Sequence, residues 1–448
     1  MTDVVTQPYD KIDKQMQERY YNLSPYNLVR VVLGKHQPND DDEHNVYTRA
    51  AETLKNWRAE GILKEEGEPA LYGYSQTYTV PGTGGDTGVK AEIRERRGFI
   101  ALGQLYDYAD KVVFRHEQTF PKHKSDRLAL FKATRAYCEQ IYMLYSDPEF
   151  VAEKAIFEAP PPTVGNSATV SHVSRTPDLE IIDEYHVIHR LWKVTGSKLI
   201  MRVVDAMADK WLLIADGHHR YETSTAYMHE RAQELGVDAN TAPRMTREGL
   251  PQPAFPEQAM MMTFVNMDAP GITILPTHRV VSGLANLSMK EFAERATQYF
   301  EIKELGASLG AAQLLTKLSE TQGVAFVAAA RDANLLLRPK ADAIAPVLQG
   351  LSPRQQQLDV TQLHKVVLEK LLALDEDTIR KGDVIRYYRE AEESVERVKS
   401  GKADVAFLIK PVTLEQMKDV SLNLEVMPQK STDFYPKLLS GLAMYTLD

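Results

Sequence analysis

The run Ala215-Asp216-Gly217-His218-His219-Arg220-Tyr221 brings a carboxylate, a glycine, two imidazoles and a guanidinium together. A glycine lets the backbone approach an anion, and an arginine donates a forked pair of hydrogen bonds to a phosphate group. The histidines can donate hydrogen bonds or carry a proton near neutral pH. Asp216 could orient a histidine, accept a proton or hold a Mg²⁺ ion between phosphates, or it could pair with Arg220 at an ordinary helix start. This concentration of residue types favours a phosphate-handling site.

The elements around this run predict where the site lies. Residues 211–215 form a short apolar run typical of a buried strand, and residues 220–235 carry apolar side chains at helical spacing. The run is therefore predicted to be a turn from a strand into a helix. The start of a helix has backbone N–H groups without intrahelical acceptors and a partial positive charge, which suits an anion.

A second acidic candidate stands in the pair His116-Glu117. The pair resembles half of a zinc-protease signature, but Phe120 occupies the position of the second histidine, which excludes that chemistry. Glu117 is our candidate general base, because a hydroxyl that attacks a phosphoryl group benefits from a positioned carboxylate. The alternative is a surface ion pair with Arg115 or Arg127.

The string Lys430-Ser431-Thr432 resembles the end of a phosphate-binding loop, although no Gly-x-x-x-x-Gly precedes it. Because prolines frame it, the string could clamp a phosphate or a metal from a rigid loop. The glycine-rich residues 81–88 lack such a pattern and indicate a flexible turn. We expect five residues outside the central turn to bind phosphate: His116, Arg127, Lys430, Ser431 and Thr432. Three further groups are left open between a site and ordinary structure: Pro8-Tyr9-Asp10, Thr277-His278-Arg279 and His364.

Composition limits the class of protein. The chain has 448 residues, of which 43% are hydrophobic, so it can bury a substantial core. A formal net charge of -9 argues against a protein that covers nucleic acid. Cys138 is the only cysteine, which excludes an intramolecular disulfide and a cysteine-rich zinc site. No apolar run is long enough to span a membrane and the first residues do not resemble a signal peptide, so we expect a cytoplasmic protein.

Strand and helix patterns are interleaved, which predicts a mixed α/β or α+β fold. Helices are expected over 46–61, 127–145 and 359–372, and a hairpin over 71–95. A proline- and serine-containing loop is expected over 158–173, and a polar excursion over 236–257. The predicted regions are 1–157 with the His-Glu-x-Thr motif, 176–300 with the central turn, and 301–448 ending in the Lys-Ser-Thr motif.

The run from Ala215 to Glu222 resembles the signature turn shared by sulfiredoxin, the ParB partition proteins and the free-serine kinases of archaea. His218 stands where sulfiredoxin has its catalytic cysteine, which excludes that reductase chemistry. The ParB version has Glu-Arg-Arg and a DNA-binding helix-turn-helix, neither of which is identified here. The kinase pattern Asp-Gly-x-His-Arg is matched by Asp216, Gly217, His219 and Arg220. The resemblance implies catalytic roles for Asp216 and His219 and a separate upstream glutamate as base.

The whole chain resembles a bacterial and archaeal family known as domain of unknown function 1015. The resemblance implies a ParB- and sulfiredoxin-like nucleotide-binding core elaborated by further segments. The strings that carry it are Gln7-Pro8-Tyr9-Asp10, Arg115-His116-Glu117-Gln118-Thr119, Lys124-Ser125-Asp126-Arg127, the central turn, Pro276-Thr277-His278-Arg279, and Met427-Pro428-Gln429-Lys430-Ser431-Thr432-Asp433-Phe434-Tyr435-Pro436-Lys437.

Together these resemblances imply a nucleotide-dependent phosphotransferase that acts on a small hydroxyl substrate, with free L-serine as the first choice. ATP or ADP would be the donor, with CTP as an alternative, and Asp216 would hold Mg²⁺. His218 and Gly217 would contact the phosphates. One rival is a nucleotide-binding switch without DNA binding, and another is a metal-dependent hydrolase with Asp216, His218 and His219 as ligands. A homodimer is compatible with all three.

Overall fold

The computed structural model describes residues 2–83, 90–119, 121–158, 176–284 and 287–447. The fold is mixed α+β, which confirms the class expected from the sequence. The chain forms two compact units, and the three expected regions do not coincide with them because residues on both sides of 158 contribute strands to one sheet. Unit 1 comprises Met1–Arg115, Thr119–Ile272 and Pro436–Asp448, and unit 2 comprises His116–Gln118 and Thr273–Tyr435.

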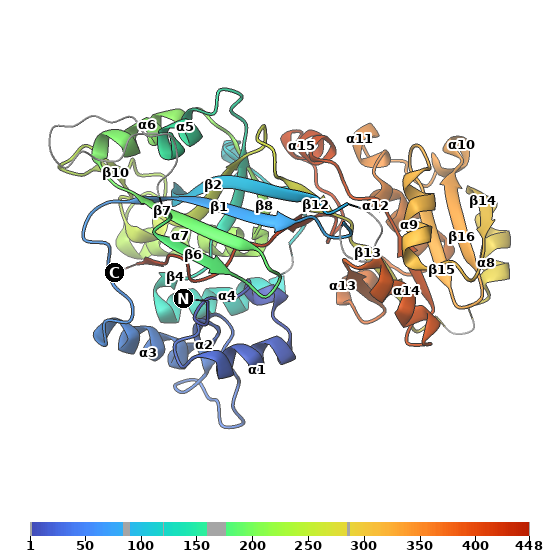
Figure 1. Cartoon of the computed structure of the whole chain (residues 1–448), viewed down its shortest axis with the longest axis horizontal. Coiled ribbons are helices and arrows are strands. Elements are labelled where there is room, and N and C mark those ends of the chain that lie inside the picture. The colour runs from blue at the N-terminus through green and yellow to red at the C-terminus, as the bar shows by residue number, and fades with distance from the viewer. Residues whose placement is uncertain (1, 84–89, 120, 159–175, 285–286, 448) are drawn as a thin grey trace. The chain divides into compact units, whose positions relative to one another are not determined.

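Unit 1 is built on a mixed eight-stranded sheet with the strand order β3-β8-β5-β11-β2-β1-β7-β6 (Figure 1). The pairs β3–β8 and β5–β11 are parallel, and the other neighbours are antiparallel. The strands are β1 (Leu71–Thr79), β2 (Ile93–Gln104), β3 (Val113–Phe114), β5 (Ile141–Tyr145), β6 (Leu179–Ile182), β7 (Ile188–Val194), β8 (Leu212–Asp216) and β11 (Ala259–Asn266).

The helix expected over 127–145 is wrong in its second half. The helix α4 (Pro121–Thr134) ends at Thr134, and residues 141–145 form β5 in the middle of the sheet. All five residues of β5 are buried, so the strand has no polar face and shows no alternation. A continuous apolar run of this kind cannot be told from a buried helix by its period.

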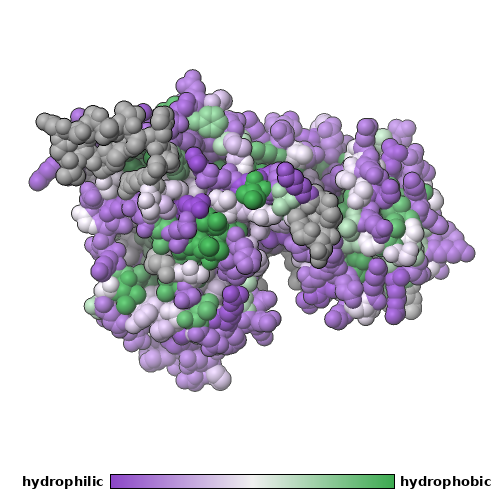
Figure 2. Space-filling view, viewed as in Figure 1, coloured by the Kyte–Doolittle hydropathy of each residue, from purple (hydrophilic) through white to green (hydrophobic). Residues whose placement is uncertain are grey.

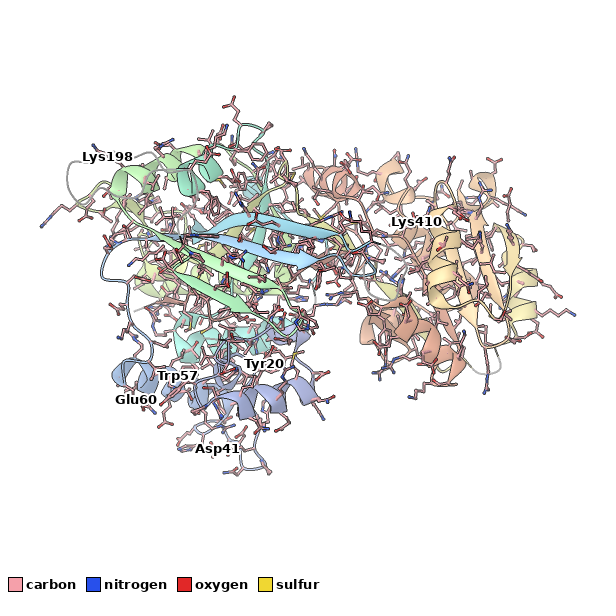
Figure 3. The ribbon with its side chains drawn as sticks, viewed as in Figure 1. Tyr20, Asp41, Trp57, Glu60, Lys198 and Lys410 are labelled. Atoms are coloured by element: carbon pink, nitrogen blue, oxygen red, sulfur yellow. The ribbon has the colours of Figure 1, made fainter. Side chains whose placement is uncertain are left out.

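The helices of unit 1 form from local signals that the sequence displays. Asn45 caps α3 by accepting hydrogen bonds from the backbone of Tyr47 and Thr48, and Trp57 on its buried stripe is 6% exposed (Figure 3). Figure 1 shows α1, α2, α3 and α4 grouped on one side of the sheet. The helices are η1 (Tyr9–Lys11), α1 (Lys14–Leu23), α2 (Val29–Val32), α3 (Val46–Ala59), η3 (Tyr108–Asp110), α4, α5 (Val151–Phe157), α6 (Ser197–Met207), α7 (His218–Leu235) and η4 (Pro256–Gln258).

The hairpin expected over 71–95 is confirmed as β1 and β2, which pair antiparallel. Residues 84–89 of the glycine-rich turn and residues 159–175 of the expected loop lie outside the described residues. The polar excursion contains a small exposed hairpin of β9 (Arg244–Met245) and β10 (Pro251–Gln252). No described helix is both long and apolar enough to cross a membrane.

The two ends of the chain meet inside unit 1. Thr6 and Ser440 exchange backbone hydrogen bonds of 3.2 and 2.8 Å, and β20 (Tyr445–Thr446) pairs with β4 (Ala136–Tyr137). Ser440 therefore lies beside Thr6, and residues 445–446 lie beside residues 136–137. This arrangement carries Lys437 into the same unit as the central turn.

Unit 2 is an antiparallel six-stranded sheet with the order β14-β16-β15-β18-β13-β17. Its strands are β13 (His278–Val281), β14 (Phe300–Leu305), β15 (Phe326–Ala330), β16 (Asn334–Pro339), β17 (Ile385–Tyr388) and β18 (Val405–Leu408), and a separate pair joins β12 (Thr273–Leu275) to β19 (Asp433–Tyr435). Its helices are α8 (Met289–Ala296), α9 (Ala311–Ser319), α10 (Ala341–Ile344), α11 (Pro353–Gln356), α12 (Asp359–Gln362), α13 (Glu376–Lys381), α14 (Ala391–Lys399) and α15 (Leu414–Leu422).

The expected helix 359–372 is confirmed, but its second part is the π-helical segment η5 (Leu363–Leu371). Each unit has its own apolar core: Leu314 is fully buried in unit 2, as is Met143 in unit 1. Figure 2 shows that the visible surface is largely hydrophilic, with hydrophobic residues in separate patches. Most of the large apolar side chains are therefore buried in the cores of the two units.

Candidate functional site

The central run forms the predicted turn between a strand and a helix. Asp216 is the last residue of β8, and α7 begins at His218 with Gly217 as its N-terminal cap. Gly217 has φ of 97°, and a Cβ there would lie 2.9 Å from Ile141 Cδ1 and 3.1 Å from an Arg220 guanidinium nitrogen. Both the backbone conformation and the lack of space therefore require glycine. No side chain caps this end of α7, which leaves its first turn suited to an anion.

Asp216 forms an ion pair that the sequence did not predict. Its Oδ2 lies 3.0 Å from Lys437 Nζ, and its Oδ1 accepts a 2.9 Å hydrogen bond from the Gly217 backbone. The Lys437 side chain is 9% exposed and that of Asp216 is 26% exposed. Burial alone would raise the pKa of Asp216, but the charges of Lys437, Arg220 and Lys11 outweigh it and hold the pKa well below its usual value. Asp216 is therefore charged throughout the physiological range.

The backbone around Lys437 is held by two buried side chains of the β1–β2 hairpin. Gln76 donates a 2.8 Å hydrogen bond to the Lys437 carbonyl, and Arg96 donates a 2.6 Å hydrogen bond to the Pro436 carbonyl. Arg96 also bonds to Gln76 through its Nε at 3.0 Å, and its guanidinium lies 4.7 Å from the centre of the Tyr142 ring. Charge-assisted bonds to carbonyls fix a backbone firmly. The hairpin thus positions Lys437 for its contact with Asp216.

Arg220 lies under the turn. It is 5% exposed and donates a 2.7 Å hydrogen bond to the Gln140 carbonyl. Burial would lower the pKa of Arg220, but Glu139, Asp216 and Asp10 raise it above its usual value. The guanidinium therefore remains a fixed positive charge beside the start of α7.

Arg127 lies in the same cluster of charges, but its guanidinium is already bound. It donates hydrogen bonds of 2.6 and 2.9 Å to Asp126 and of 2.8 Å to the Val32 carbonyl, and it lies 4.0 Å from the centre of the Tyr9 ring. Glu139 lies 3.9 Å from Arg127 and accepts a 3.0 Å hydrogen bond from the Tyr9 backbone. Arg127 thus organises the N-terminal segment, and its contact with phosphate stays a prediction.

The first turns of α7 carry the remaining members of the run. His218 is 7% exposed and His219 is half-buried. Glu222, one turn further on, accepts a 3.1 Å hydrogen bond from Arg115 and pairs with Lys124. Burial would raise the pKa of Glu222, but Lys124, Thr119 and Arg115 lower it overall. These contacts fasten the start of α7 to residues 115–124.

The His-Glu and Lys-Ser-Thr motifs meet each other in unit 2. His116 is fully buried, and its Nε2 lies 2.7 Å from Thr432 Oγ1. The Glu117 carboxylate accepts a hydrogen bond from the backbone of Lys430, and Ser431 donates one to the Pro428 carbonyl. Here Glu117 holds the loop that carries Lys430. Its role as general base stays a prediction.

The structure therefore sorts the predicted site residues into two groups. Unit 1 holds Arg127 and the run from Asp216 to Arg220, and unit 2 holds His116, Glu117 and residues 430–432. Three charged residues near the turn were missed as site residues: Glu139, Lys11 and Lys437. Lys437 ends one of the strings that carry the family resemblance, which is the one signal that could have found it.

The described residues contain no group of three or more His, Cys, Asp or Glu side chains arranged to hold a metal ion. The three-ligand site of the hydrolase alternative is therefore not formed by the described side chains of Asp216, His218 and His219. A Mg²⁺ ion is commonly held by one or two carboxylates, with phosphate oxygens and waters completing its shell. The single charged carboxylate of Asp216 fits that mode.

Three solved structures show what the chain is similar to. A conserved hypothetical protein from Pyrococcus furiosus has 13% identity and a TM-score of 0.34, with 76% of this chain and 92% of that chain covered. A free serine kinase in complex with AMP has 14% identity and a TM-score of 0.33, with coverage of 75% and 86%. SbnI with a C-terminal truncation from Staphylococcus aureus has 10% identity and a TM-score of 0.34, with coverage of 76% and 85%. These likenesses carry no argument about activity.

The sequence comparisons are more decisive about family. No curated protein matches the chain. A family model described as Protein of unknown function (DUF1015) matches residues 1–361. This match covers the central turn and four of the other strings that carry the predicted resemblance. The chain therefore belongs to the family described as Protein of unknown function (DUF1015).

Proposed function

We propose that the chain is a nucleotide-dependent phosphotransferase that acts on a small hydroxyl substrate, with free L-serine as the first candidate. The observation that carries the proposal is the charged Asp216, paired with Lys437 at 3.0 Å, at the start of a helix that buries Arg220 beside it. The Asp-Gly-x-His-Arg pattern supports kinase chemistry within this class. Phosphoryl transfer depends mainly on positioning and on neutralising charge, and this turn offers both.

Each residue of the turn has a distinct proposed role. The first-turn N–H groups of α7 and the cations Arg220 and Lys437 would hold the phosphates of ATP or ADP. Asp216 would hold a Mg²⁺ ion, which would supply positive charge to neutralise the phosphates. This role requires Lys437 to move from the carboxylate to a phosphate oxygen as the nucleotide binds. His219 would donate a hydrogen bond to the transferred group.

Proton acceptance is a separate question. A carboxylate whose pKa is held well below its usual value accepts protons poorly, which favours a charge-neutralising role for Asp216 over a general-base role. Glu117 remains our candidate for the base, because a positioned carboxylate can accept the proton of an attacking hydroxyl. A Glu117→Gln variant that keeps nucleotide affinity but loses turnover would support that role.

The test is product formation by the purified full-length chain. The protein is incubated with Mg²⁺, L-serine and ATP, ADP or CTP in separate reactions, and O-phosphoserine is measured by mass spectrometry. Asp216→Asn should lower the rate by about 100-fold or more, as expected when a preorganised charge is lost. The matched control is Asp209→Asn, because Asp209 lies just before β8 and its side chain is 79% exposed. The control should keep the wild-type rate.

Other outcomes would contradict the proposal. Nucleotide turnover that no hydroxyl acceptor changes would argue for the nucleotide switch. Transfer to another small alcohol, with the same dependence on Asp216, would keep the reaction class and replace serine. Product formation that survives in Asp216→Asn would rule out the proposed site.

A further inference from the structure

Among the described residues, several buried polar atoms of unit 2 have no hydrogen-bond partner, and Arg279 Nε, Tyr387 Oη and His364 Nε2 are three of them. Arg279 is fully buried and His364 is 6% exposed. A buried donor without an acceptor costs roughly 1–3 kcal/mol, and more when it is charged. Folded proteins rarely leave such groups without water or an ion. Arg279 Nε and the hydroxyl of Tyr387 are donors, and donors of this kind suit a bound acceptor where they lie close together.

Two of the three groups lie on one face of the unit 2 sheet. Arg279 of β13 stands directly opposite Tyr387 of β17, so their side chains share a face, and the guanidinium lies 5.5 Å from the centre of the tyrosine ring. His364 lies on η5, close enough for the Arg279 charge to act on it: burial lowers the pKa of His364 first, and Arg279 adds to the effect. His278 precedes Arg279 in the strand and points to the other face, where its Nδ1 accepts a hydrogen bond from Ile409.

The charge at this place is not fully compensated. Arg279 donates to the backbone carbonyls of Thr277 and Lys430, so two of its nitrogens are used by neutral acceptors. Burial lowers the pKa of Arg279 to about 10, although Tyr387 and Glu117 act in the opposite direction. The Glu117 carboxylate accepts a hydrogen bond from the Lys430 backbone. Arg279 is thus a buried cation whose two hydrogen-bonded acceptors are neutral carbonyls, and an added anion would balance its charge.

Two irregular pieces of backbone flank the same place. Lys430 has φ of 57°, in the left-handed region that non-glycine residues seldom adopt. His364 belongs to a π-helical segment, and such segments are rare and frequent at functional sites. Both irregularities cost free energy that packing must offset. Their position beside Arg279 supports a site over an accident of packing.

We propose that Arg279, Tyr387 and His364 form a binding site for a small oxyanion, a phosphate or a carboxylate group, within unit 2. An oxyanion offers only acceptors, which matches the N–H of Arg279, the hydroxyl of Tyr387 and the Nε2–H tautomer of His364. This proposal rests on residues of unit 2 and does not depend on the phosphotransferase proposal.

Calorimetric titration of the full-length chain with inorganic phosphate tests the site. Tyr387→Phe removes one hydroxyl and should weaken the affinity of one bound phosphate by about tenfold or more, the usual effect of losing a hydrogen bond to a charged group. Tyr388→Phe is the matched control, because Tyr388 is the next residue on β17 and belongs to the other face. The control should bind phosphate as the wild type does.

Further arms separate the alternatives. Arg279→Gln should abolish this binding, and Asp216→Asn should leave it unchanged. Because Tyr387→Phe removes a hydroxyl with no described partner, it should fold with an equal or higher Tm when phosphate is absent, which keeps the test valid if Arg279→Gln does not fold. If acetate also binds and its affinity falls in Tyr387→Phe, the site accepts a carboxylate group. If phosphate binds and acetate does not, the ligand group is a phosphate. Identical titrations of wild type and Tyr387→Phe would overturn the proposal and leave these groups to water.

Discussion

Asp216 is a strand-end carboxylate whose partner comes from the last 12 residues of the chain. The charge of Lys437 is the largest of those that keep Asp216 ionised, and in the proposed function the same lysine would contact a phosphate. An ion pair at a helix start is often only structural. Here the pair lies among further charges on Arg220 and Lys11 that act on the same carboxylate. The charge of Asp216 therefore depends on several cations and not on Lys437 alone.

Removing the partner of Asp216 should destabilise the protein in a pH-dependent way. We expect Lys437→Met to lower the free energy of unfolding at pH 7 by about 1–3 kcal/mol, less than a fully buried pair because Asp216 keeps some exposure. The pKa of Asp216 is depressed in the folded protein, so its contribution is present above about pH 4 and is lost as the pH falls through the folded-state value. The difference in the free energy of unfolding between the wild type and Lys437→Met should therefore become smaller below about pH 4. Urea denaturation across this range measures it.

The control for that experiment is an exposed ion pair in unit 1. Lys132 lies 2.6 Å from Glu230, and their side chains are 42% and 39% exposed. Lys132→Met should cost less than about 1 kcal/mol at any pH. Equal losses in both variants would mean that the Asp216–Lys437 pair has no special role.

Gly217 should tolerate no side chain. Gly217→Ala must adopt φ of 97° and place a Cβ 2.9 Å from Ile141 Cδ1, so we expect it to lower the free energy of unfolding by roughly 2–4 kcal/mol. Gly236 ends the same helix with φ of 66° and open space around it. Gly236→Ala should cost about 1 kcal/mol, because only the backbone is strained. Similar losses at both positions in denaturant titrations would show that crowding under the turn is unimportant.

At the scale of elements, the hairpin of β1 and β2 does more than complete the sheet. Its buried Arg96 and Gln76 bind the carbonyls of Pro436 and Lys437, so a strand pair places a residue from the end of the chain. Strands in the interior of a sheet are rigid, and a charge placed by them keeps its geometry. The central turn therefore depends on elements that carry none of its own motif.

Loss of Arg96 should release the C-terminal segment. Arg96→Met removes the bond to the Pro436 carbonyl, and we expect faster hydrogen exchange of the backbone amides of residues 437–440. Arg97 is the matched control, because its side chain is 47% exposed and pairs with Glu95 on the surface. Arg97→Met should leave the exchange of this segment unchanged. Unaltered exchange in Arg96→Met would show that other contacts hold the segment.

At the scale of the whole molecule, the chain builds two units with separate apolar cores. Proteins with more than one unit commonly unfold in more than one step. The motifs belong to different units: the turn belongs to unit 1, and the His-Glu and Lys-Ser-Thr motifs belong to unit 2. Each unit can therefore be perturbed on its own.

Calorimetry should show two unfolding transitions that respond to different cores. Leu144 and Leu314 are both fully buried, in β5 of unit 1 and α9 of unit 2. Each change to Ala should cost about 2–5 kcal/mol and lower the midpoint of one transition only. A single transition that both variants lower equally would show that the two units unfold as one.

The sequence by itself determined the features that depend on near neighbours. The apolar run before Asp216 and the helical spacing after it predicted the strand-to-helix turn, and the β1–β2 hairpin followed from alternation on either side of a glycine-rich segment. The interleaved strand and helix patterns predicted the mixed α+β class, and short strings along the chain predicted the family. These signals are short in range, because strand and helix periods and cap residues act over a few positions.

Only the tertiary structure decided the rest. It turned residues 141–145 into a central strand, because burial on both faces removes the period that would have revealed it. The structure also shows the ion pair of Asp216 with Lys437 and the hydrogen bond from the Lys430 backbone to Glu117. Contacts between residues so distant in the sequence depend on the path of the whole chain. No local pattern encodes that path, so the sequence predicted the strand-to-helix turn but not the ion pair of Asp216 with Lys437.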